Sequence, residues 1–105
     1  MYKFPTIYLD KGGTSIVKID LTNFDFKEGS LVFSMHLKNT REIIKEAVFT
    51  TPGVHNLIFE CDFTKDLILG KDNYEYDFFF HIEGERFQQC PPSPIVVEST
   101  VGGKK

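Results

Sequence analysis

Residues 74–82 read Tyr-Glu-Tyr-Asp-Phe-Phe-Phe-His-Ile, and this stretch decides the class of fold. Apolar side chains recur at every second position, with charged or polar residues at most positions between them. A period of two places alternate side chains on one face of a β-strand. The stretch therefore predicts a strand whose core-facing residues are Tyr74, Tyr76, Phe78, Phe80 and Ile82.

The same alternation recurs along the rest of the chain and predicts seven or eight short strands. We expect them at residues 6–10, 15–22, 30–37, 43–49, 54–61, 74–82, 87–90 and 95–101. Residues 62–70 break the period, because Phe63 and Leu67 are one helical turn apart, and this segment predicts a single short helical turn. Short strands without intervening helices are typical of an antiparallel β-sandwich. Because Trp is absent and Cys61 and Cys90 are close in sequence, we expect an all-β, immunoglobulin-like sandwich without the antibody disulfide.

Length and composition fit one small domain. The chain has 105 residues, of which 41% are hydrophobic, including eleven Phe and four Tyr, so it can build a single packed core. We expect this domain to span residues 1–101 and residues 102–105 to form a flexible tail.

The charge balance and the hydropathy pattern argue against two classes of partner. A net charge of −3 lacks the long-range attraction with which nucleic-acid-binding proteins collect phosphates. No apolar run approaches the length of a membrane span, and the first ten residues do not resemble a signal peptide. We therefore expect a soluble protein made in the cytoplasm that binds neither nucleic acid nor membrane.

The order of several short motifs resembles the immunoglobulin-like N-terminal domain family of phage baseplate upper proteins. Lys11-Gly12-Gly13-Thr14 resembles the family's opening turn, although Gly13 stands where the family has an acidic residue. Thr64-Lys65-Asp66-Leu67 resembles its short threonine-to-leucine turn, and Tyr74-Glu75-Tyr76-Asp77 its tyrosine-rich strand. Glu83-Gly84-Glu85 and Val96-Val97-Glu98 complete the order, so the resemblance covers most of the chain.

This resemblance implies a non-enzymatic structural or assembly module of a phage or prophage tail, in a baseplate or a tail fibre. Its partners would be other tail or baseplate proteins, with at most weak self-association. The protein would be made in the bacterial host cytoplasm and would end in the virion tail. The alternative is a carbohydrate-binding β-sandwich, for which Tyr2, Tyr8 and Phe79 are the available surface aromatics.

The histidines and carboxylates do not form a recognisable catalytic or metal-binding pattern. His36 and His81 fall on outward phases, as do Glu75 and Asp77, but no histidine pair has a short ligand spacing. Acidic residues on the solvated face of a strand are common, and no nucleophile or phosphate-binding motif is present. We therefore predict no catalytic residue, no metal and no cofactor.

Two cysteines allow at most one disulfide. Cys61 shares the inward phase of Leu57 and Phe59, so we expect a buried thiol. Cys90 precedes two prolines at the end of a strand, and whether the two cysteines pair stays open.

Phe79 is the aromatic residue that departs from the alternation. It lies between Asp77 and His81 on the polar phase of its strand. An exposed aromatic ring there can fill a partner's pocket, so we predict an interface at Phe79 with Asp77 and His81 at its rim. The alternative is that the domain's own loops cover both faces of this strand.

Overall fold

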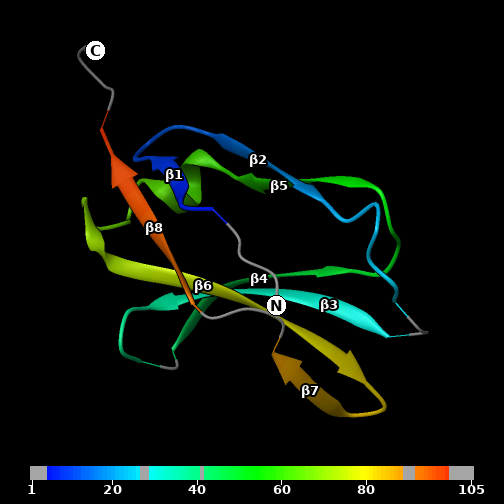
Figure 1. The fold of residues 1–105 in the computed structure, drawn as a ribbon. Helices are drawn as coiled ribbons and strands as arrows, with labels where there is room; N and C mark the ends of the chain where they lie inside the picture. The colour runs from blue at the N-terminus through cyan, green and yellow to red at the C-terminus, as the bar shows by residue number, and fades with distance from the viewer. Residues whose placement is uncertain (1–4, 27–28, 41, 89–91, 100–105) are drawn as a thin grey trace.

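The computed structural model describes residues 5–26, 29–40, 42–88 and 92–99, and these form an all-β fold of two sheets (Figure 1). A single turn of helix, α1 (Cys61–Thr64), accompanies the strands. The strands are β1 (Ile7–Asp10), β2 (Ser15–Asp20), β3 (Ser30–Leu37), β4 (Ile43–Phe49), β5 (Val54–Phe59), β6 (Gly70–Ile82), β7 (Glu85–Gln88) and β8 (Ser93–Glu98). Within the described residues, no helix is both long and apolar enough to span a membrane.

The larger sheet has the strand order β1-β8-β6-β3-β4 and curls into half a barrel. Its pairs are antiparallel except β1 with β8, which are parallel. β6 is long enough to pair with two strands in succession, with β8 along its first half and with β7 along its second half. In the part of the chain that the structure describes, the smaller sheet consists of β2 and β5, which lie side by side above β3 and β6 in Figure 1.

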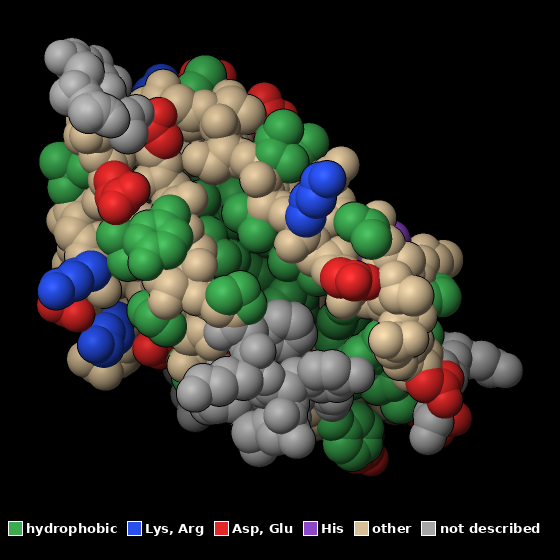
Figure 2. Space-filling model, turned by 45° about the horizontal axis from the view of Figure 1, so that its top comes forward, with side chains coloured by type: hydrophobic (Ala, Val, Ile, Leu, Met, Phe, Trp, Pro, Cys, Tyr) green, Lys and Arg blue, Asp and Glu red, His purple; other side chains and the backbone are tan. Residues whose placement is uncertain are grey.

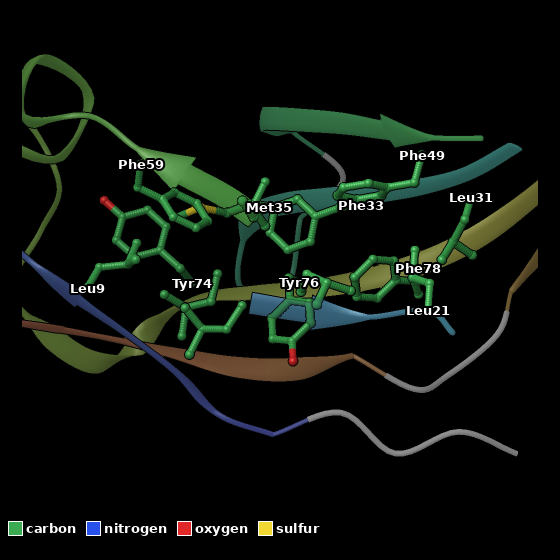
Figure 3. Packing of buried hydrophobic residues seen from close by; sticks show 14 of the residues in the cluster. Leu9, Leu21, Leu31, Phe33, Met35, Phe49, Phe59, Tyr74, Tyr76 and Phe78 are labelled. Atoms are coloured by element: carbon green, nitrogen blue, oxygen red, sulfur yellow. The ribbon is translucent and has the colours of Figure 1, made fainter. Parts of the chain in front are cut away.

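The core lies between the two sheets and follows the alternation of the strands. Phe33, Tyr76 and Phe78 are buried at its centre, with the Phe33 ring centroid 5.3 Å from that of Tyr76 and 5.5 Å from that of Phe78 (Figure 3). The predicted inward phase of β6 is therefore confirmed for Tyr74, Tyr76, Phe78 and Phe80, whereas Ile82, at the end of the strand, is only partly buried.

Some of the predicted strands have the same first and last residues in the structure, and others begin or end at different residues. β3 and β4 have the predicted bounds, whereas β5 ends at Phe59 rather than at residue 61. The helical turn begins at Cys61, whose side chain is exposed. The expectation of a buried Cys61 is therefore wrong, because the chain leaves the strand before this residue and the alternation ends with it. Cys90 and the predicted tail at 102–105 lie outside the described residues.

Two turns that are distant in sequence are joined by hydrogen bonds. The fully buried Thr64 hydroxyl donates to the Gly13 carbonyl oxygen at 2.7 Å and accepts from the Gly12 N–H at 3.1 Å. The Lys11 ammonium donates to the carbonyl oxygens of Lys65 and Leu67 at 2.6 and 2.5 Å. These bonds fasten the β1–β2 turn to the segment after α1, and we call this contact the turn joint.

Candidate functional site

The pairing of β3 with β6 gathers polar side chains on the outer face of the larger sheet. His36 lies opposite Glu75, and Ser34 lies opposite Asp77. These residues alternate with core residues such as Phe33, so they face away from the smaller sheet. The register therefore places two carboxylates, an imidazole and a hydroxyl within one patch.

The His36 ring lies between the two carboxylates. Its Nδ1 atom is 3.7 Å from Glu75 Oε2, and its Nε2 atom is 3.8 Å from Asp77 Oδ2. Both distances are longer than a hydrogen bond, and each contact is an ion pair only when His36 is protonated. Nδ1 also lies 3.3 Å from the Leu37 carbonyl oxygen.

Side chains of the β3–β4 connection, β4 and β7 flank this patch and enclose a pocket of about 470 Å³, which we call the outer pocket. The lining combines carboxylates, a guanidinium group, hydroxyls and an amide with two apolar side chains. It consists of Ser34, His36, Asn39, Thr40, Ile43, Glu75, Asp77, Arg86 and Pro92.

Phe79 lies beside the outer pocket but does not present an exposed ring. The Arg86 guanidinium carbon is 3.8 Å from the centroid of the Phe79 ring, and the residue is only 8% exposed. The β6–β7 hairpin turns at Glu83 and Gly84, which both have positive φ, and this places Arg86 where it covers the ring diagonally. The expectation that Phe79 is an exposed anchor is wrong. The ring is covered, as in the alternative, but by the Arg86 side chain of β7 rather than by a loop.

The other residues of the predicted interface have different surroundings. Asp77 lines the outer pocket, whereas His81 is exposed and lies opposite Ser30. Because Ser30 and His36 are six residues apart on one strand, about 20 Å of backbone separates the two histidine sites. Within the described residues, no three His, Cys, Asp or Glu side chains are placed to hold a metal ion.

Ser34 and Arg86 belong to the site but were not among the predicted site residues. The outward phase of residues 30–37 is the signal that could have found Ser34, and the hairpin turn at Glu83-Gly84 is the signal for Arg86. Among the described residues, no hydrogen bond links Ser34 to His36, so the nucleophile and base contact of acyl transfer is not formed. The arrangement suits binding by hydrogen bonds.

Burial raises the pKa of the Asp77 carboxyl above its usual value, and the neighbouring charge of Glu75 raises it further. The charges of His36 and Arg86 oppose only part of this rise. Asp77 is therefore harder to ionise in the folded protein than in the unfolded chain.

We expect Asp77→Asn to gain stability relative to the wild type as the pH rises. A raised carboxyl pKa means that the folded wild type loses stability between the ordinary value of 3.8 and the raised value. The asparagine variant does not ionise and escapes this loss. Urea midpoints at pH 3 and pH 7 measure the effect, with the exposed Asp72→Asn as a control that should not show it. If the wild type instead gains stability relative to Asp77→Asn as the pH rises, the charges of His36 and Arg86 outweigh the cost of burying the Asp77 carboxylate.

No family model matches this chain, and the comparisons with curated proteins and with solved structures found no match.

Proposed function

We propose that this chain is a non-enzymatic assembly module of a phage or prophage tail, built as an immunoglobulin-like sandwich. The turn joint is the observation that carries the proposal. It brings together Lys11-Gly12-Gly13 and Thr64-Lys65-Asp66-Leu67, two of the motifs through which the sequence resembles baseplate upper proteins. Because the two motifs are hydrogen-bonded to each other, both serve to hold the same two turns together, and this supports the family resemblance.

The departure from the family at Gly13 also has a physical explanation. A Cβ atom added to Gly13 would lie 2.6 Å from the Asp10 carboxylate oxygen Oδ2. The Asp10 carboxylate, at the end of β1, therefore occupies the space that a side chain at position 13 would need, which accounts for glycine there.

Strand order supports the immunoglobulin-like part of the proposal. The run β8-β6-β3-β4 corresponds to strands G, F, C and C′ of a variable-type domain, and β2 with β5 corresponds to B and E. Tyr74 lies early in β6, the counterpart of strand F, and its hydroxyl accepts a hydrogen bond from the Ile68 N–H at 2.8 Å. This bond to backbone upstream has the form of a tyrosine corner.

The smaller sheet offers a surface for assembly. Among the described residues, no strand flanks β2 or β5 as the outer strands flank B and E in the immunoglobulin fold, because β1 joins the larger sheet and residues 50–53 connect β4 directly to β5. On its outer face Ile16 and Ile58 lie opposite each other and are 61% and 45% exposed. Figure 2 shows hydrophobic side chains at the surface on this side of the molecule. We propose that a strand or apolar face of another tail protein packs against Ile16 and Ile58.

Replacing both isoleucines by a charged pair should abolish binding to the tail partner without unfolding the domain. The double variant Ile16→Glu with Ile58→Lys removes the apolar contact, while opposite charges facing each other preserve the strand pairing. Tagged wild type and variant are expressed in the strain that carries the gene, tail proteins are co-purified, and circular dichroism checks folding.

The variant His81→Glu is the matched control, because it alters the exposed end of the interface predicted from the sequence. We expect it to retain tail proteins. Loss of tail proteins with His81→Glu but not with the double variant would place the interface at Asp77 and His81. Failure of the wild type to retain any tail protein would contradict the assembly function.

A further inference from the structure

The outer pocket has the size of a ligand site and is not used by the proposed assembly surface. Its volume of about 470 Å³ falls within the range of roughly 300–1,000 Å³ that is typical of small-molecule pockets. It opens on the outer face of β3 and β6, whereas Ile16 and Ile58 lie on the smaller sheet.

The pocket contains one buried hydroxyl, that of Ser34, which has no hydrogen-bond partner among the described residues. Ser34 is 3% exposed, and no described residue forms a hydrogen bond with its side chain. Every side-chain polar atom of the described residues that is fully shielded from solvent has a hydrogen-bond partner. Because the Ser34 oxygen has no such partner, it must be accessible from the pocket that Ser34 lines. A buried hydroxyl in this position can give and accept one hydrogen bond with a ligand.

The remaining polar groups are mixed in charge. Glu75 and Asp77 supply acceptors, while Arg86 and Asn39 supply donors to the same space. An anion would meet two carboxylates, and a cation would meet the Arg86 guanidinium. A neutral ligand with adjacent hydroxyls satisfies both sets, because each hydroxyl can donate to a carboxylate and accept from a guanidinium or amide group.

Apolar side chains complete the fit. Ile43 and Pro92 line the same pocket and can contact the C–H face of a ring. We propose that the outer pocket binds a neutral polyhydroxylated ligand, of the chemical class of a monosaccharide unit, through Ser34, Glu75, Asp77 and Arg86. This proposal does not depend on the tail-assembly function.

Nuclear magnetic resonance with defined sugars tests it. ¹⁵N-labelled protein is titrated with the methyl glycosides of glucose, galactose, mannose, rhamnose and N-acetylglucosamine, up to about 50 mM each, which detects binding of millimolar strength. We expect at least one glycoside to cause saturable shifts of the Ser34, His36 and Asp77 amide signals. Agmatine serves as the cation probe and inorganic phosphate as the anion probe.

Variants locate the binding. Ser34→Ala should weaken the affinity about three- to tenfold, the effect of losing one hydrogen bond. The double variant Glu75→Gln with Asp77→Asn should weaken it at least tenfold, because charged acceptors form the stronger bonds. Asp72→Asn, at an exposed site outside this pocket, should leave the affinity unchanged. Melting curves confirm that each variant is folded.

The proposal is overturned if none of the five glycosides shifts these signals. It is also overturned if agmatine or phosphate shifts them while every sugar fails, since the pocket would then select charge. Sugar-induced shifts that survive both pocket variants would place the sugar elsewhere and equally refute it.

Discussion

Phe78→Ala should lower the free energy of unfolding by about 3–5 kcal/mol. The Phe78 side chain is fully buried in the middle of β6, and its ring contacts those of Phe33 and Tyr76. Removing it leaves a cavity between the two sheets that neighbouring strands can fill only in part. Because a domain of this size is stable by roughly 5–15 kcal/mol, this loss is a large fraction of the protein's stability. Urea unfolding followed by circular dichroism measures the loss.

Phe87→Ala is the matched control, since it removes the same side chain from a site that is 48% exposed. We expect a loss of less than about 1 kcal/mol there. Equal losses for Phe78→Ala and Phe87→Ala would contradict the difference in burial between the middle of β6 and β7.

Thr64→Val should lower the free energy of unfolding by about 1–3 kcal/mol, although valine has nearly the same shape. The substitution removes the hydroxyl that donates to the Gly13 carbonyl and accepts from the Gly12 N–H. Both backbone groups are then left without this partner at a site where Thr64 itself is fully buried. Urea unfolding measures the loss.

Thr64→Ser keeps the hydroxyl and should retain most of the stability that valine loses. Thr51→Val, at an exposed threonine, should change little. If Thr64→Val is as stable as the wild type while Thr64→Ser is destabilised, packing of the methyl group holds the turn joint together and its hydrogen bonds contribute little.

The alternation of apolar and polar residues predicts strands well where one face of the strand is buried and the other is exposed to solvent. Residues 43–49 illustrate this, since the Pro52-Gly53 turn keeps the segment too short for a typical helix and the structure contains β4 there. Cys61 illustrates the limit. Alternation predicts whether a side chain is buried only while the chain is extended. β5 ends at Phe59 and the helical turn begins at Cys61, so the pattern no longer applies there.

The candidate site depends on pairings that no local pattern contains. The outward phases of His36, Glu75 and Asp77 are visible in the sequence, but their meeting requires the β3–β6 register. Burial of Phe79 requires both the β6–β7 hairpin and the length of the Arg86 side chain that returns across the ring. An aromatic residue on the polar phase of a strand therefore indicates a covered position as readily as a free one.

Whether the chain is built into a tail is tested most directly on purified particles. The strain that carries the gene is induced to produce particles, which are isolated on a density gradient and labelled with a gold-conjugated antibody against this chain. We predict gold at the tail tips, together with peptides of this chain in the mass spectrum of the particle fraction. Complete tails that carry neither label nor peptides, with the chain left in the unassembled fraction, would contradict the proposed function.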